Sequence, residues 1–184
     1  IVMKERKEGR RFTVHNITFT ALFVAMGVLL PQIFHMAGGA DAGKIFLPMH
    51  IPVLLSGLLL GPVSGCVVGV LSPVLSCLLT GMPKLPMMPF MVLELAAYGG
   101  MAGFLAYNRR LNVYVSLIGA MAAGRVMNAA ALIIATYVFH LHVSPVLSVL
   151  TSATVGAAGI IIQLVFIPAI VLACRKVVQK YVQN

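Results

Sequence analysis

Long apolar stretches, separated by short polar or Gly/Pro-rich segments, dominate the chain. Six of them predict membrane helices, at residues 16–35, 46–60, 63–79, 90–106, 112–139 and 146–173. A helix rises ~1.5 Å per residue, so about 20 residues cross the ~30 Å hydrocarbon core of a bilayer. The second and third stretches are at the lower limit of that length, and Pro48, Pro52 and Pro73 interrupt them. Because irregular backbone at membrane depth must be covered by protein or line a cavity, we expect these two helices to face the interior or to be partly broken.

The segments between the helices differ in character. Residues 36–44 (MAGGADAGK) predict a Gly/Ala-rich loop, 80–89 a proline-rich loop and 140–145 a histidine-containing loop, whereas 61–62 and 107–111 predict tight turns. With six helices, the tight turns lie on the side of both termini. Ten of the 13 Lys and Arg residues lie on that side, namely Lys4, Arg6, Lys7, Arg10, Arg11, Arg109, Arg110, Arg175, Lys176 and Lys180. The positive-inside rule therefore predicts cytoplasmic termini, and a count of five helices would split these basic clusters across the membrane.

Composition supports a membrane protein. The chain is 60% hydrophobic and 9% charged, with a mean hydropathy of +1.03, whereas soluble domains have about 25% charged residues. We predict an all-α membrane protein, a compact bundle of six transmembrane helices in a single domain, residues 1–184. Its parts are a cytoplasmic basic lead-in at 1–15, the bundle at 16–174 and a cytoplasmic tail at 175–184. The net charge is +9, and most of the basic residues lie at the ends of the predicted helices, where residues that set membrane topology are found. We therefore expect the chain to contact the lipid bilayer and not to bind nucleic acid.

One arginine lies near the middle of the predicted helix 112–139. A cation at mid-bilayer costs at least ~2.5 kcal/mol, which makes Arg125 a candidate functional residue, and Asn128 lies one turn on along the same face. Glu94 lies near the start of the predicted helix 90–106, with Tyr98 one turn deeper, and the Glu94 side chain is long enough to reach toward Arg125. Two interpretations stay open: a buried ion pair that locks two helices together, or a cavity in which Arg125 and Asn128 face polar substrate groups.

Three further polar residues are candidates for the same site. His50 lies just below the outer surface, where it either donates to a ligand or is half-solvated. Lys44 lies at the outer rim and either attracts an anionic ligand or extends to water. Gln163 shares a small-residue face with Gly156 and Gly159, which favours close helix packing, with the Gln163 amide as a candidate pocket donor.

Motifs for catalysis are not visible. The sequence has no Ser/His/Asp set on converging helices, no H-E-x-x-H and no phosphate-binding glycine loop. His140 and His142 have no third metal ligand in view. We therefore predict no catalytic residue, no metal and no cofactor.

In the first predicted helix, Ala21 and Ala25 form an A-x-x-x-A pattern, which lets another helix approach closely. Three longer stretches accompany it: FLPMHIPVLLSGLLLGP (46–62), LSPVLSCLLTGMP (71–83) and MAAGRVMNAAAL (121–132). With these motifs the chain resembles the substrate-binding S components of energy-coupling factor (ECF) vitamin transporters. The resemblance covers nearly the whole chain, including its length, its six helices and its cytoplasmic ends.

The resemblance implies a role and partners. An S component in the cell membrane of a prokaryote binds a scarce water-soluble vitamin or precursor from outside. It docks, here through the Ala21/Ala25 face, onto a transmembrane T component that carries two cytoplasmic ATPases, and it topples in the membrane to deliver its cargo. The segment 36–45 would be the lid over the pocket. ATP hydrolysis belongs to the partners, so the chain itself is expected not to be an enzyme.

Family resemblance leaves the substrate open, since similar scaffolds bind flavins, thiamine, biotin, folates, niacin, pyridoxine-type compounds or pantothenate. Arg125, with His50 and Lys44, suits a carboxylate, and the absence of Trp argues against a large stacked ring, which favours pantothenate. Glu94 works against this choice if it already neutralises Arg125. The alternatives outside the family are a stand-alone channel or secondary carrier, for which no inverted repeat or coupling acid is evident, and a membrane enzyme or assembly factor.

Overall fold

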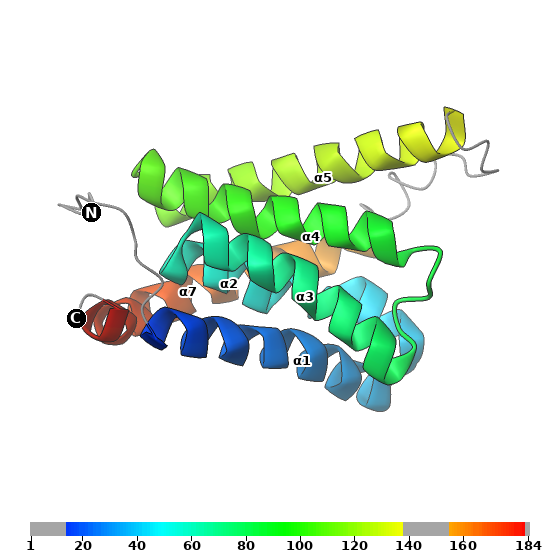
Figure 1. Ribbon diagram of the computed structural model, residues 1–184, viewed down its shortest axis with the longest axis horizontal. Helices are drawn as coiled ribbons and strands as arrows, with labels where there is room; N and C mark the ends of the chain where they lie inside the picture. Colours follow the sequence, from blue (N-terminus) through cyan, green and yellow to red (C-terminus); the bar gives the residue numbers. More distant parts are fainter. Residues whose placement is uncertain (1–13, 138–154, 183–184) are drawn as a thin grey trace.

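The computed structural model describes residues 14–137 and 155–182, and for residues 37, 39–44 and 175–182 it describes the backbone alone. Within these ranges the chain is helical and contains no strand. Its elements are α1 (Val14–Phe46), α2 (His50–Leu60), α3 (Pro62–Thr80), α4 (Met88–Gly103), η1 (Phe104–Asn108), α5 (Val113–Tyr137) and α7 (Ala157–Val182). The helices pack against one another as one bundle (Figure 1). The predicted all-α fold is therefore confirmed.

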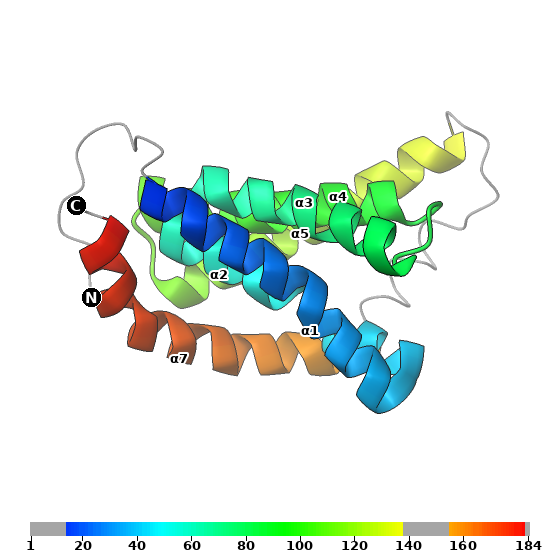
Figure 2. The ribbon, with the colours of Figure 1, turned by 60° about the horizontal axis from the view of Figure 1, so that its bottom comes forward.

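Over the described residues, five helical segments are long and apolar enough to cross a membrane: Val14–Met36, Pro62–Thr80, Met88–Asn108, Val113–Tyr137 and Ala157–Cys174. Large apolar side chains on their outer faces are exposed, such as Leu29, Ile118 and Phe166. Only lipid accommodates such faces on every side of a bundle, so the chain is a multi-pass membrane protein. The start of α1 and the end of α7 lie at the same end of the bundle (Figures 1 and 2).

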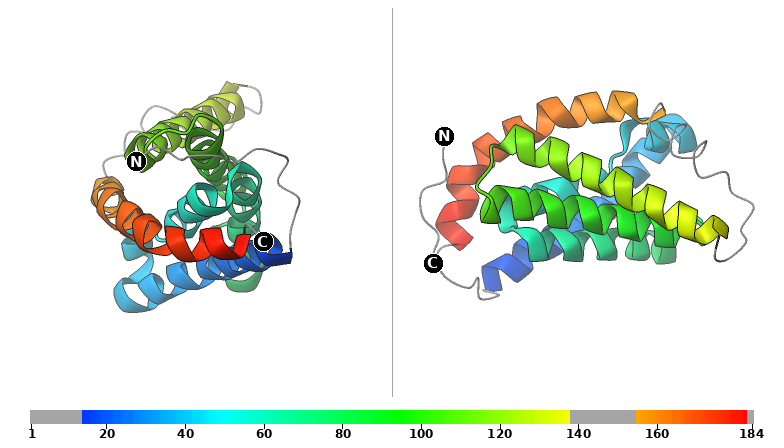
Figure 3. Two further views of the ribbon diagram at one scale, coloured as in Figure 1. Left: turned by 90° about the vertical axis from the view of Figure 1, so that its left-hand side faces the viewer. Right: turned by 90° about the horizontal axis from the view of Figure 1, so that it is seen from above.

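The interior helix is α2. Ten of its 11 residues are buried, and its length of ~16 Å is only about half the thickness of the hydrocarbon core of a bilayer. Seen along the long axis, the other helices are arranged around it (Figure 3, left). Pro48 precedes it and Pro52 lies in its first turn, where a missing N–H costs little. The expectation of a short interior helix is thus confirmed for α2. It is wrong for α3, which continues through Pro73 as a 19-residue helix and exposes Leu78.

Glycines let α3 and α4 touch through their backbones. A Cβ on Gly65 would lie 2.2 Å from the Gly99 carbonyl oxygen, and a Cβ on Gly99 would lie 2.1 Å from the Gly65 carbonyl oxygen. One turn along, a Cβ on Gly69 would lie 2.4 Å from the Leu95 carbonyl oxygen. Any larger residue would separate the helices. This contact fixes the height of α4 beside α3, and with it the height of Glu94.

The two tight turns predicted from the sequence are confirmed. Gly61 alone separates α2 from α3, and its φ of 108° is a conformation that favours glycine. The second turn leads from α4 to α5: α4 passes into the π-helical turn η1, whose Tyr107 hydroxyl donates to the Leu59 carbonyl oxygen, and α5 begins at Val113. This bond joins η1 to the end of α2, so both turns close the same end of the interior helix.

The predicted loop at 36–44 is wrong, because α1 remains helical through Phe46. The helix does not stay straight. The rings of Phe34 and Phe46 lie 5.3 Å apart, although 12 residues of straight helix would span ~18 Å. The last part of α1 therefore folds back, and it lies beside the first turns of α7 (Figure 2). Alanines favour the helix and packing against α7 supports it, which outweighs the cost of the glycines.

Other boundaries also differ from the sequence prediction. Helix α2 begins at His50 instead of residue 46, because the corner at 47–49 precedes it. Helix α7 runs to Val182 instead of ending at 173, so most of the predicted tail is helical. Its sequence there, CRKVVQKYV, combines good helix formers with apolar residues at helical spacing. The loop at 140–145 and the start of the predicted last helix lie outside the described residues.

Candidate binding site

Within the five candidate spans Glu94 is the only Asp or Glu and Arg125 is the only Lys or Arg, and the structure joins them. Glu94 on α4 and Arg125 on α5 form an ion pair, with 3.3 Å between Glu94 Oε1 and Arg125 Nη1. Asn128, one turn along α5, donates its amide N–H to Glu94 Oε2. Each carboxylate oxygen therefore has its own partner. The side chain of Glu94 is 7% exposed and that of Arg125 is 20% exposed.

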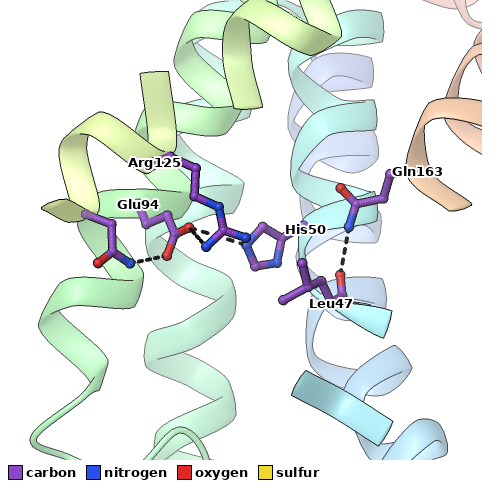
Figure 4. A network of polar contacts seen from close by, with 6 residues as sticks. Leu47, His50, Glu94, Arg125 and Gln163 are labelled. Carbon is purple, nitrogen blue, oxygen red and sulfur yellow. Dashed lines mark hydrogen bonds and ion pairs between the residues drawn. The ribbon is translucent and has the colours of Figure 1, made fainter. Parts of the chain in front are cut away.

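His50 of the interior helix α2 lies beside the pair of Glu94 and Arg125. It is the first residue of α2 and is 3% exposed. Its Nε2 lies 4.0 Å from Glu94 Oε1, beyond hydrogen-bond distance. Its ring meets the ring of Tyr98 edge to face, with centroids 5.0 Å apart. Figure 4 shows the Arg125 guanidinium reaching between Glu94 and His50.

Tyr98 and Gly124 explain how α4 and α5 come close enough for the pair to form. Tyr98, one turn after Glu94, is fully buried. A Cβ on Gly124 would lie 2.5 Å from Cδ2 of the Tyr98 ring, so the ring lies against bare backbone just before Arg125. The sequence prediction named Tyr98 but missed Gly124. The signal was a small residue directly before the buried arginine.

Several polar atoms of this cluster have no hydrogen-bond partner among the described residues: His50 Nδ1 and Nε2, Arg125 Nε and Nη2, and Glu94 Oε1, whose one contact is the ion pair. A buried polar group without a partner costs about 1–3 kcal/mol. The guanidinium atoms are donors, and a neutral imidazole supplies one donor and one acceptor. The arrangement can therefore bind a small polar molecule that carries acceptor oxygens and hydroxyl groups.

Gln163 lies elsewhere. It is 1% exposed on α7, and its Nε2 donates to the Leu47 carbonyl oxygen over 3.4 Å. In Figure 4 this contact lies on the far side of His50 from Arg125. The structure thus brings together Glu94, Tyr98, Arg125, Asn128 and His50, and it places the Gln163 amide on backbone at the α1–α2 corner.

The remaining candidates lie on α1. Ala21 and Ala25 are both exposed, and Leu22, Leu29 and Ile33 are exposed with them. This apolar face is open to another helix or to lipid. Lys44 lies in the folded-back part of α1, and its side chain is outside the described residues.

Comparison with known proteins gives one match. The family model described as "ECF transporter, substrate-specific component" matches residues 15–174. No curated protein and no solved structure matches the chain significantly.

Proposed function

Because the chain belongs to the substrate-specific components of ECF transporters, we propose that it captures a water-soluble vitamin or vitamin precursor from outside the cell. It delivers this cargo inward when docked on a T component and two ATPase subunits. The proposed binding residues are Arg125, Asn128, Glu94, Tyr98 and His50. ATP hydrolysis is assigned to the partner subunits.

The cluster around Glu94 and Arg125 is the observation that carries this proposal. A purely structural ion pair would satisfy its own atoms, since unpaired buried charge destabilises a fold. Here Glu94 Oε2 accepts from Asn128 and Glu94 Oε1 only faces Arg125 Nη1 at 3.3 Å, while two guanidinium nitrogens and both imidazole nitrogens have no hydrogen-bond partner among the described residues. Those atoms converge from α5 and α2. A ligand bound between them would satisfy them, so the pair also frames a site.

The uncommitted atoms define the ligand chemistry. Arg125 Nε and Nη2 lie on one side of the guanidinium fork and suit a carboxylate or amide oxygen. His50 suits a hydroxyl group, which both donates and accepts. The cluster lies beside the first turn of α2, where the positive end of the helix dipole favours an anion. Pantothenate combines a carboxylate, an amide and hydroxyl groups on a flexible chain, and it is the substrate that we propose.

Mass spectrometry of small molecules released from the purified protein identifies the cargo directly.

In binding titrations with pantothenate, Arg125→Ala should weaken binding about 10- to 100-fold, which corresponds to the free energy of one charged hydrogen bond. Asn128→Ala should also weaken binding, because Glu94 loses its second partner. Ser116→Ala, a buried polar position on the same helix, is the matched control and should keep the wild-type affinity. If Arg125→Ala and Asn128→Ala both bind the identified cargo with wild-type affinity, Arg125 and Asn128 are not part of the binding site.

The exposed face of α1 is the proposed docking surface. Ala21→Trp should prevent co-purification with the T component and the ATPases and should abolish uptake, because the bulky ring blocks close helix approach. Ile118→Trp, on the exposed face of α5, is the control and should leave the complex intact. A complete and active complex with Ala21→Trp would refute this surface. Flux through the chain alone in liposomes would instead support a stand-alone carrier.

The proposed orientation places both termini in the cytoplasm, because the basic residues cluster at that end. A fluorescent protein fused after Asn184 should fold and fluoresce, whereas an alkaline phosphatase fused there should stay inactive. The reverse pattern would invert the topology and turn the site toward the cell interior.

A further inference from the structure

The corner between α1 and α2 has an unusual backbone. Leu47 has a φ of 49°, in the left-handed region that non-glycine residues rarely adopt. Such a conformation costs about 1–3 kcal/mol and persists where the surroundings hold it. Three residues further, His50 begins α2, and its backbone N–H donates to the Leu47 carbonyl oxygen over 3.0 Å. The direction in which His50 leaves the corner therefore depends on that carbonyl.

Helix α7 holds this corner from outside. A Cβ on Gly159 would lie 2.5 Å from the Ile45 carbonyl oxygen, so α7 lies directly against the backbone that leads into the corner. One turn on, the Gln163 amide donates to the Leu47 carbonyl oxygen over 3.4 Å. Gln163 is 1% exposed and Leu47 is half-buried, so this bond is a partly buried one. The same carbonyl thus accepts from His50 and from Gln163.

We propose that Gln163 is a positioning residue for ligand binding: it holds the Leu47 carbonyl, and through it the direction of His50 into the cluster. This inference rests on the proposed function in taking His50 as a ligand-binding group. It replaces the idea of Gln163 as a direct pocket donor. It also gives α7 an effect on a site whose other side chains come from α2, α4 and α5.

The first test needs no ligand. The chain has five histidines, so the ring signals of His50 in an NMR spectrum of histidine-labelled protein can be assigned with His50→Ala. Gln163→Met keeps the volume and removes the amide. It should shift the His50 ring signals, while Val171→Ala, a buried change two turns along α7, should leave them in place. Unshifted His50 signals in Gln163→Met would overturn the proposal.

The second test is a double-mutant cycle with pantothenate as the probe. Gln163→Met should weaken binding about fivefold, the worth of one neutral hydrogen bond, in the wild-type background. In the His50→Ala background it should change the affinity little, because the group that it positions is gone. An equal loss in both backgrounds would show that Gln163 acts independently of His50 and would refute the proposal.

The two proposals fail separately. If Arg125→Ala leaves binding intact, the proposed site fails, whatever Gln163 does. If Arg125→Ala weakens binding and Gln163→Met leaves the His50 signals unshifted, the proposed site is supported and the positioning role of Gln163 is refuted. If the wild type does not bind pantothenate, the substrate assignment fails and the NMR measurement decides the role of Gln163.

Discussion

The ion pair between Glu94 and Arg125 allows a sharp stability prediction in the absence of ligand. Its atoms lie 3.3 Å apart, and Coulomb's law with an effective dielectric constant of ~20 gives an attraction of ~5 kcal/mol before desolvation is counted. Breaking a buried pair from one side costs ~3–5 kcal/mol. Because Arg125 is 20% exposed, we take the lower part of that range. Glu94→Gln or Arg125→Met alone should therefore destabilise the protein by ~3–4 kcal/mol.

The double variant Glu94→Gln/Arg125→Met tests the reasoning. It removes both charges and leaves no unpaired ion, so its stability should lie within ~1 kcal/mol of wild type. For a chain of this size the single variants should lower the melting temperature by roughly 5–15 °C. The outcome that refutes a buried, coupled pair is additivity, in which the double variant loses as much as the two single variants together.

The assay follows from the composition. The chain has no Trp, so intrinsic tryptophan fluorescence is absent. Cys77 is 8% exposed and becomes reactive on unfolding, whereas Cys66 is exposed in the folded state. Thermal unfolding in detergent can be followed with a thiol-reactive dye in a background that carries Cys66→Ser and Cys174→Ser. The dye then reports on Cys77 in α3.

Three further predictions concern the helix contacts. Gly99→Ala should strongly destabilise the protein in the same assay, since its Cβ would meet the Gly65 backbone. Gly100→Ala should be much milder, because its Cβ would meet only the movable side chain at position 66, which is serine in the assay background. Equal losses in the two would contradict the α3–α4 contact. Tyr107→Phe should cost ~1 kcal/mol by removing its bond to the α2 carbonyl, and an unchanged melting temperature would argue against that bond. Ser116→Ala should be neutral or stabilising by up to ~1 kcal/mol, because the buried hydroxyl has no hydrogen-bond partner in the described chain; a clear loss of stability would contradict this.

Much of the site could be predicted because charge in an apolar helix is costly. Arg125 and Glu94 had few partners other than each other, and the helical repeat placed Asn128 beside the pair. His50 was named because it lies just below the outer surface, on the short helix predicted at 46–60. These arguments use residue type and spacing alone.

The contact of Gln163 could not be predicted in this way. Its partner is the backbone carbonyl of Leu47, a non-glycine residue with a positive φ. No side-chain pattern encodes such a corner. The helical end of α1 was missed for a related reason: a Gly/Ala-rich sequence is ambiguous by itself, and contact with Gly159 of α7 supports the helix. Long-range backbone contacts decided both cases.

The burial of α2 has a consequence for how the protein responds to its membrane. Bilayers of different acyl-chain length change the tilt and packing of helices that face lipid, at a cost of fractions of a kcal/mol per ångström of mismatch. Helix α2 is buried at all but one residue, so it is shielded from this mismatch, and His50 with it. The position of His50 should therefore vary little with acyl-chain length, while docking through the proposed surface on the exposed face of α1 should vary with it.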